Sequence, residues 1–223
     1  MKLLLLLAGR GGAGGAFSDA VIGEAERLSA HGATSVCAMR QIADDPFGLA
    51  VPGMRPFEAS IDARFATVGA GVEAVAGLAD RVASLVHVDL SGAFGGEDHV
   101  IIPCDPTPVR YQYLMRRKIH TTQAAYVDHY LHNHSRFGHR TAGIEGYVQF
   151  HIDPVASRAL ATAAGVGLWA ADSVSELHAA SLTTMTDGFA VDPSLAGEAA
   201  TDEERFVDRG NSVMFISDVI ARH

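Results

Sequence analysis

Side chains that can transfer protons or donate hydrogen bonds are concentrated in residues 109–152, one fifth of the chain. This stretch contains all five tyrosines and six of the eleven histidines, at positions 120, 129, 132, 134, 139 and 151. A neutral imidazole accepts a proton near neutral pH, and a phenol can donate a hydrogen bond to a developing negative charge. The composition therefore predicts acid–base chemistry within this stretch.

A strand, a helix and a second strand would position these side chains. Residues 109–117 alternate between two faces and are rich in Val, Tyr and Leu, which is typical of a strand, and residues 145–152 alternate again. Between them, Thr121 or Thr122 can cap the start of a helix that would extend to about residue 137. On that helix, four-residue intervals place three side chains along one face: Tyr126, Tyr130 and His134.

The second strand has one apolar face and one polar face. Its even positions from 148 to 152 are Val, Phe and Ile, and its odd positions are Tyr147, Gln149 and His151. We expect the apolar face to pack on helices, so that the polar face points into the interior between sheets. Hydrogen-bonding groups that are buried together require partners or a ligand. These three residues are therefore candidate site residues, and cross-strand pairing should bring Tyr113 and Arg117 beside them.

The same stretch resembles the EthD family, a branch of the dimeric α+β barrel superfamily with a ferredoxin-like fold. The resemblance rests on a strand that ends in the basic segment 114–118, the aromatic-x3-aromatic-x3-His helix, and the returning strand 146–151. The acidic segment 202–208 is similar to the turn before the family's last strand. Two positions depart from the family pattern: Tyr130 stands where Trp is usual, and Ser135 where Gly is usual.

The order of predicted elements repeats in the two halves of the chain. Each half reads strand–helix–strand–strand–helix–strand, which is the ferredoxin-like order. We expect an α+β fold in which residues 1–103 and 109–223 form two tandem ferredoxin-like repeats. The second repeat is the EthD-like one and should carry the site, and the first should be structural. Their antiparallel sheets would face one another and close an α+β barrel within one chain. In detail, a glycine-rich loop should precede a short strand at 99–103, a strand should lie near 166–171, and a helix should span 173–186.

The resemblance implies a function on small molecules. Related barrels include dehydratases, cyclases, isomerases and cofactor-free oxygenases. We therefore expect a cofactor-independent enzyme for a small, largely apolar oxygenated compound, such as an aromatic catabolite or a polyketide-like molecule, with a lyase or dehydratase reaction preferred. His134 or His151 would transfer the proton, and Tyr147 would donate to an oxyanion, all around one cavity. The side chains expected to bind the substrate are Tyr126, Tyr130, Gln149, Trp169, Tyr113 and Arg117.

Three other interpretations remain open. The first is a non-catalytic small-molecule-binding or accessory protein that uses the same cavity. The second is an NADP-dependent oxidoreductase, because the segment 9–14 matches G-x-G-x-x-G between a strand and a helix, although no acidic residue ends the next strand and we expect a structural turn. The third is a metal site formed by the clustered histidines, but HExxH is absent and no cysteine is near, so neither a metal nor a cofactor is expected.

Charge and composition limit the partners. The net charge of −9 argues against nucleic acid and against an anionic membrane surface. Cys37 and Cys104 are the only cysteines and lie far apart in the sequence, which fits a reducing cytoplasm. The apolar start, residues 1–8, is interpreted as a buried first strand and not as a signal peptide. We expect a cytoplasmic protein that binds a small-molecule substrate, with a homodimer as a further option.

Overall fold

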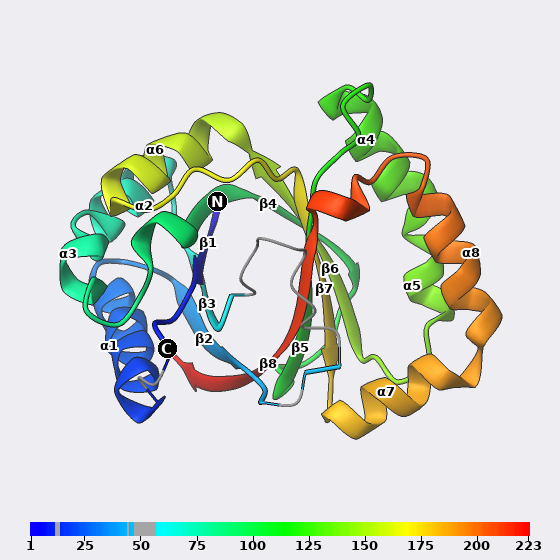
Figure 1. Ribbon diagram of the computed structural model, residues 1–223, viewed down its shortest axis with the longest axis horizontal. Coiled ribbons are helices and arrows are strands. Elements are labelled where there is room, and N and C mark those ends of the chain that lie inside the picture. The colour runs from blue at the N-terminus through cyan, green and yellow to red at the C-terminus, as the bar shows by residue number, and fades with distance from the viewer. Residues whose placement is uncertain (12–13, 44, 47–56) are drawn as a thin grey trace.

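Eight strands form a closed antiparallel barrel at the centre of the molecule (Figure 1). The computed structural model describes residues 1–11, 14–43, 45–46 and 57–223. Around the barrel the strands follow the order β1, β3, β2, β8, β5, β7, β6 and β4, and β4 pairs with β1 to close the ring. The strands are β1 Lys2–Leu7, β2 Ser35–Gln41, β3 Ala59–Arg64, β4 Gly92–Ile102, β5 Val109–Met115, β6 Gly146–Asp153, β7 Ser173–Ala179 and β8 Val213–Arg222.

Each half of the chain supplies four neighbouring strands in the same relative order. β4, β1, β3 and β2 come from residues 1–103, and β8, β5, β7 and β6 come from residues 109–223. The halves meet where β2 pairs with β8 and where β4 pairs with β6. The expected α+β fold, with two ferredoxin-like sheets in one antiparallel barrel, is therefore confirmed.

Two layers of helices cover the barrel from opposite sides (Figure 1). The first layer lies over the strands of the first half and consists of α1 Gly14–Ala30, α2 Val68–Val75, α3 Leu78–Val82 and α6 Pro154–Ala164. The second layer covers the other sheet and consists of α4 Gln123–His129, the π-helical turn η2 Tyr130–His134, α5 Arg136–Arg140, α7 Leu182–Val191 and α8 Pro193–Glu203. Short 3-10 turns, η1 Val88–Leu90 and η3 Arg209–Asn211, precede β4 and β8.

The first strand is buried on both faces, as its uninterrupted leucine run predicts. Leu3, Leu5 and Leu7 belong to the core beneath the first helix layer, whereas Leu4 and Leu6 belong to the core inside the barrel. None of the five is more than 1% exposed. A strand between a helix layer and a filled barrel needs apolar side chains on both faces. The expected buried first strand is confirmed.

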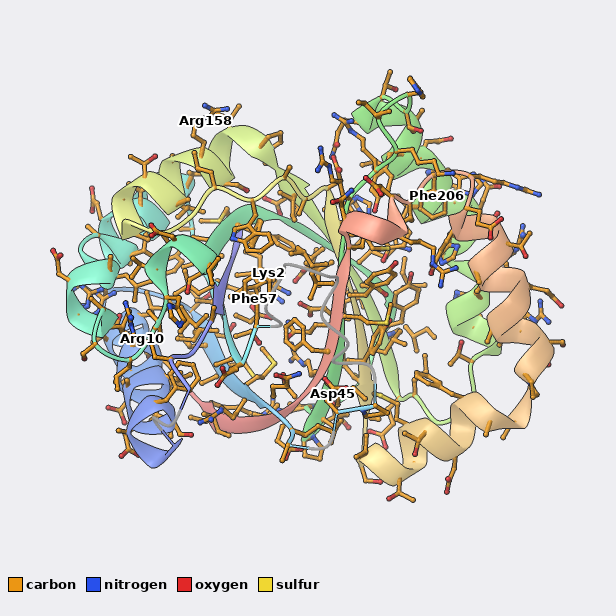
Figure 2. All side chains as sticks on the ribbon, viewed as in Figure 1. Lys2, Arg10, Asp45, Phe57, Arg158 and Phe206 are labelled. Carbon is orange, nitrogen blue, oxygen red and sulfur yellow. The ribbon has the colours of Figure 1, made fainter. Side chains whose placement is uncertain are left out.

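The barrel interior also contains a buried ionic network that the sequence did not predict. Lys2 Nζ lies 2.6 Å from Glu176 Oε1 and 3.0 Å from Asp62 Oδ2, and Figure 2 shows Lys2 within the ring of strands. Arg110 Nη1 lies 3.3 Å from the same Asp62 oxygen. Burial alone would lower the pKa of Lys2, but the surrounding carboxylates raise it above its ordinary value. Because an unpaired buried charge is strongly destabilising, these charges depend on one another.

The second half departs from the sequence-based expectation between β6 and the last strand. The helix α6 had not been expected, β7 replaces the strand predicted at 166–171, and α7 and α8 replace the helix predicted at 173–186. The sequence carries a helix start signal at α6. Asp153 caps the helix by accepting hydrogen bonds from the backbone N–H groups of Val155 and Ala156, and Pro154 occupies the first turn. This helix then covers strands of the first half (Figure 1).

In the first half, β4 passes straight through the region expected to be a glycine-rich loop. These glycines allow the neighbouring strand β6 and the helix α6 to lie close to β4. A Cβ atom at Gly96 would lie 2.0 Å from the His151 carbonyl oxygen, and one at Gly95 would lie 2.7 Å from Leu160 Cδ1. Glycine within a strand often marks such a close approach, so composition alone misled the prediction.

The antiparallel barrel overturns the dinucleotide-binding alternative. A doubly wound nucleotide-binding fold requires a mostly parallel sheet, and all pairings between the eight strands are antiparallel. Residues 12–13 of the glycine-rich segment lie outside the described residues. In the part of the chain that the structure describes, no helix has the length and apolar character needed to span a membrane.

Candidate active site

A pocket of about 240 Å³ lies between the sheet of the second half and its helix layer. Strands β5, β6 and β7 form one wall, and α5, α7 and α8 form the other, on the side of the barrel where these helices stand in Figure 1. The lining is mainly apolar, and it includes three tyrosines, a histidine and a glutamate: Tyr111, Tyr113, Tyr147, His134 and Glu203. We call this cavity the tyrosine pocket.

The polar face of β6 points toward this helix layer, so its predicted orientation toward the barrel interior is wrong. Phe150 and Ile152 belong to the apolar core inside the barrel. On the opposite face, Gln149 Nε2 donates to the Tyr130 carbonyl oxygen of η2 at 3.0 Å, and Tyr147 lines the tyrosine pocket. An eight-stranded barrel has a narrow interior that side chains fill, and here bulky apolar groups fill much of it. The polar aromatic face instead meets helices that are themselves rich in Tyr and His.

A π-helical turn brings His134 to the pocket. The turn spans Tyr130–His134, and the N–H of Ser135 donates to the Tyr130 carbonyl oxygen at 3.2 Å. The helix predicted to run to residue 137 is therefore present, but its hydrogen bonds change to a π-helical pattern between α4 and α5. A π turn inserts one residue and changes the direction of the following side chains, and such turns are frequent at functional sites. His134 is only 8% exposed, and its ring centroid lies 5.9 Å from that of Tyr130.

Asp202 fixes the tautomer of His134. One oxygen, Oδ2, lies 2.9 Å from His134 Nδ1 and 3.0 Å from His129 Nε2. Burial opposes a charge on Asp202, but the hydrogen bonds from both histidines hold its pKa below the ordinary value. An ionised carboxylate can only accept, so His134 Nδ1 carries the hydrogen and Nε2 keeps its lone pair. His134 is thereby oriented as a proton acceptor.

Glu203 is the second ionisable group in the pocket wall. Its Oε1 lies 3.8 Å from His134 Nε2, and its Oε2 lies 3.5 Å from Arg209 Nε. Burial raises the pKa of Glu203 to about 7, with Arg209 opposing the rise and Asp202 adding to it. Burial also lowers the pKa of His134, so its imidazole is neutral at pH 7. A neutral base and a carboxyl group that still carries its proton near neutrality therefore lie side by side.

A chain of hydrogen bonds orients the Tyr147 hydroxyl. His151 Nε2 donates to Gln149 Oε1 at 3.1 Å, and Gln149 Nε2 donates to the Tyr147 hydroxyl oxygen at 2.8 Å. An amide oxygen can only accept, so the His151 proton lies on Nε2. Burial raises the pKa of Tyr147, which keeps the hydroxyl protonated. Because this hydroxyl accepts from Gln149, its own proton is left to donate.

The other tyrosines divide between the pocket and its support. Tyr113 lines the pocket, and its buried hydroxyl makes no hydrogen bond of good geometry to any described residue. Tyr126 and Tyr130 are fully buried behind the wall, where the Tyr126 hydroxyl lies 2.6 Å from Ser173 Oγ. Both rings pack against Phe206, which Figure 2 shows beneath the helices of this layer. These two tyrosines position the turn that carries His134.

Comparison with protein families shows that the EthD domain pattern matches residues 118–210. These residues form an EthD domain. His134, Tyr147, Asp202 and Glu203 all lie within it. A comparison with curated proteins found no match.

Solved structures share the fold of the whole chain. An anthrone oxidase-like protein has a TM-score of 0.61 and 11% identity, over 100% of this chain and 91% of that one. A protein from Fusobacterium nucleatum, described as a "putative monooxygenase", has a TM-score of 0.57 and 9% identity, with 100% and 93% covered. One with the same description from Lactobacillus acidophilus has a TM-score of 0.53 and 9% identity, with 99% and 94% covered. At these identities the likeness shows the fold alone.

The prediction that His151 and Trp169 share one cavity with His134 is wrong. In the EthD domain, His151 lies beyond Gln149, outside the tyrosine pocket, with its ring centroid 4.2 Å from that of His99. Positions 147 and 151 are separated by about 13 Å along a strand, more than a cavity of this size spans. Trp169 packs against the core inside the barrel, where its ring centroid lies 5.0 Å from that of Phe57 in an edge-on arrangement.

Arg117 also lies outside the tyrosine pocket of the EthD domain. Its Nε lies 3.1 Å from Asp172 Oδ1, and its Nη1 donates to the Thr121 carbonyl oxygen at 3.2 Å. The strand alternation placed Arg117 on the face of Tyr113, but β5 ends at Met115, and beyond that residue the alternation no longer holds. The sequence could not show where the strand would stop.

The expectation that both histidines titrate near neutrality is wrong for His151, and the pKa of His134 lies below its ordinary value. Burial lowers the pKa of His151 to about 4, and the nearby His99 lowers it further. Burial also lowers the pKa of His134, although Asp202 opposes that shift. Desolvation disfavours the charged form of an imidazole, and the sequence could not show how deeply these rings are buried.

Asp202, Glu203 and Arg209 are the site residues that sequence reasoning missed. The acidic run at 202–204 was visible, but only the fold places it beside His134, where α8 ends at Glu203. Within the described ranges, no group of three or more His, Cys, Asp or Glu side chains is arranged to hold a metal ion. Instead, His129 and His134 of the EthD domain share one oxygen of Asp202.

Proposed function

We propose that this chain is a cofactor-independent enzyme that performs acid–base chemistry on a small, largely apolar oxygenated compound, with a lyase or dehydratase reaction. One observation carries the proposal: His134 Nε2 and Glu203 Oε1 lie 3.8 Å apart in the wall of an apolar pocket. Burial lowers the pKa of the histidine and raises that of the carboxyl group to about 7. A pair of titratable groups shifted in this way provides one base and one acid near neutral pH.

The geometry supports the dehydration of a hydroxy ketone. His134 Nε2 takes the proton from the carbon beside the carbonyl group, and Tyr147 donates a hydrogen bond to the carbonyl oxygen, where negative charge develops. Glu203 gives its proton to the leaving hydroxyl group, which departs as water. A C–H and a C–O bond break and a C=C bond forms. The proton on His134 then returns to Glu203.

The pocket supports the substrate class. Its lining is mainly apolar, and its volume of about 240 Å³ suits a compound of one to a few rings. The Tyr113 hydroxyl has Ser212 and Arg209 beside it but no hydrogen bond of good geometry to a described residue, and a substrate oxygen would offer it a better partner. The fold neighbour described as anthrone oxidase-like bears the name of a polycyclic aromatic ketone, which favours an aromatic or polyketide-like substrate. We retain a cytoplasmic location and a possible homodimer as expectations.

An oxygenase is the second candidate, and the descriptions of the fold neighbours favour it. Removal of a proton from an activated ring by His134 would also begin a reaction with O₂. The two reactions differ in what they consume. A dehydratase releases water and needs no oxygen, whereas an oxygenase stops under anaerobic conditions. The same assay with and without O₂ therefore separates them.

Turnover of a panel of aromatic hydroxy ketones and polyketide-like cyclic ketones tests the proposal. We expect His134→Ala to lower kcat by roughly 10²–10⁴-fold while circular dichroism shows a folded protein. The wild-type rate should fall as pH drops below the lowered pKa of His134, and fall again above about pH 7 as Glu203 loses its proton. Glu203→Gln should remove the alkaline fall.

A matched control and two contrary outcomes complete the design. His132→Ala removes an exposed histidine from the same turn and should leave the rate unchanged. If His134→Ala and Glu203→Gln both keep the wild-type rate, the acid–base mechanism is wrong. If compounds of the panel bind in the pocket by calorimetry but none is converted, the chain is a small-molecule-binding protein.

A further inference from the structure

A second hollow lies between α6 and the segment that leads from β5 into α4. Figure 1 shows α6 and α4 both toward the top of the view. Its volume is about 420 Å³, and none of its lining residues belongs to the tyrosine pocket. Three arginines and three large apolar side chains define it, and we call it the arginine groove: Arg116, Arg117, Arg158, Ile119, Leu168 and Trp169. Two of these, Arg117 and Trp169, were expected at the active site but lie here.

Two of the three arginines form no ion pair within the described part of the chain. Arg117 is occupied by its contacts with Asp172 and the Thr121 carbonyl oxygen. The guanidinium groups of Arg116 and Arg158 form neither an ion pair nor a hydrogen bond with any described residue, and Arg116 is half-buried. Figure 2 shows Arg158 on the outer side of α6. Positive charge gathers here although the chain carries a net charge of −9.

The apolar part of the groove is fixed in place and open to solvent. Trp169 Nε1 donates to the Ser91 carbonyl oxygen at 3.2 Å, and Gly92 leaves room for the ring, since a Cβ atom there would lie 3.0 Å from Trp169 Cδ1. Ile119 is 83% exposed and Leu168 is 65% exposed. Exposed apolar side chains that gather beside unpaired arginines are typical of a binding site and not of a solvated face.

We propose that the arginine groove binds a small amphipathic anion. A carboxylate or phosphate group would bind Arg116 and Arg158, because a guanidinium forms directed, charge-assisted hydrogen bonds with such groups. The apolar body of the ligand would lie along Trp169, Ile119 and Leu168. The site is separate from the tyrosine pocket, so it does not depend on the function proposed above.

The single tryptophan of the chain allows a direct test. We would titrate the wild-type protein with octyl phosphate, octanoate, octanol and inorganic phosphate, and follow the emission of Trp169 together with calorimetry. Saturable binding is expected for octyl phosphate or octanoate, and comparison of the two identifies the preferred anionic group. Octanol and inorganic phosphate should bind at least about tenfold more weakly, because each retains only one of the two contacts. The affinity for the anions should also fall with added salt.

Matched variants locate the site. Arg116→Gln and Arg158→Gln should each weaken the binding of the better anion by about tenfold. Arg136→Gln removes the same charge from an exposed position on α5, outside the groove, and should change nothing. Tyr147→Phe alters the tyrosine pocket and should likewise leave this binding unchanged. Circular dichroism confirms that each variant is folded.

Four outcomes would overturn the proposal. They are the absence of saturable binding at millimolar concentrations, equal binding of octanol and the anions, an equal loss with Arg136→Gln and the groove variants, and binding that Tyr147→Phe abolishes. A change of Trp169 emission that follows protein concentration without any ligand would mean that the groove is a contact between copies of the chain. In that case the small anion is not its occupant.

Discussion

The two helix layers of this barrel cover sheets with the same strand order, but they pack on those sheets differently. Over the first half, small and aliphatic side chains such as Leu28, Ala74, Val75 and Leu78 join the outward leucines of β1 in one continuous core. Over the second half, tyrosines, a histidine and a glutamate replace many of these aliphatic groups, and the tyrosine pocket remains between sheet and helices. The comparison shows that the topology fixes where a cavity can form, while side-chain size and polarity decide whether it does.

The two layers also differ in how closely a buried glutamate is paired with arginine. Glu24 of the first layer is held by Arg27 at 2.9 Å and by Arg81 at 2.7 Å, and although burial works in the opposite direction, these partners lower its pKa. Glu203 of the second layer lies 3.5 Å from Arg209 and 3.8 Å from the neutral His134, and burial raises its pKa to about 7. A well-paired carboxylate stabilises a fold, whereas a poorly paired one is available for proton transfer.

Truncation of one leucine in the core beneath the first layer, and of one leucine in the second layer, should give the largest difference in stability. Leu5→Ala removes a side chain that is 0% exposed in the first layer's core, and we expect it to lower the free energy of unfolding by about 2–5 kcal/mol. Leu195→Ala in α8 should cost less than half as much, because that side chain already borders the tyrosine pocket and has fewer neighbours to lose. Urea unfolding followed by circular dichroism measures both. Equal losses would contradict the difference in packing.

Glu203→Gln should stabilise the protein at alkaline pH. The folded-state pKa of Glu203 is raised to about 7 from its ordinary value of 4.5, so the folded state binds this proton more tightly than the unfolded state. The stability associated with that proton is complete below pH 4.5 and is lost as pH rises through about 7. We expect the variant to gain on the order of 2–3 kcal/mol at pH 8.5 and nothing at pH 4.5.

The neighbouring Glu204 supplies the control for that experiment. It is exposed, so Glu204→Gln should leave the pH dependence of urea unfolding unchanged. A gain for Glu203→Gln that is the same at pH 4.5 and pH 8.5 would show that the carboxyl group is not desolvated. Glu203 would then resemble Glu24, the paired glutamate of the first layer.

Two glycine substitutions should act in opposite directions, with smaller effects. A Cβ atom at Gly23 of α1 meets nothing within 4 Å, so Gly23→Ala should raise the free energy of unfolding by about 0.5–1 kcal/mol. A Cβ atom at Gly138 of α5 would lie 2.3 Å from Tyr147 Cδ1, so Gly138→Ala should lower stability by about 1–3 kcal/mol and displace the tyrosine. Thermal unfolding measures both changes. A neutral Gly138→Ala would mean that the Tyr147 ring is free to shift.

The sequence predicted the fold better than the site. The leucines of β1, the helix starting near Thr122 and the alternation of residues 147–152 follow from local periodicity. The repeated order of such elements in the two halves, together with the resemblance to the EthD family, predicted the barrel. Which face of β6 points outward was not predictable, since both faces are buried and only the closed barrel distinguishes them. Asp202 and Glu203 contact His134 across nearly seventy positions of sequence, and no local pattern encodes such a contact.

The pKa values of the two histidines could not be predicted from the sequence either. His134 and His151 both looked like groups that titrate near neutrality, but burial by distant segments lowers the pKa of each. The helix α6 shows the reverse case. Its start signal, Asp153 followed by Pro154, was present in the sequence and could have been found.

The ionic network inside the barrel has a consequence for the order in which the protein is made. Lys2 is needed at the centre of the barrel, but its partner at 2.6 Å, Glu176, is synthesised 174 residues later. At ordinary rates of translation, this delay lasts roughly ten to thirty seconds. Throughout it, β2 and β4 remain open edges without β8 and β6, available to pair with other nascent chains. We therefore infer that residues 1–103 and 109–223, despite their matching strand order, do not mature one after the other, because the barrel closes only once β6 and β8 have been synthesised.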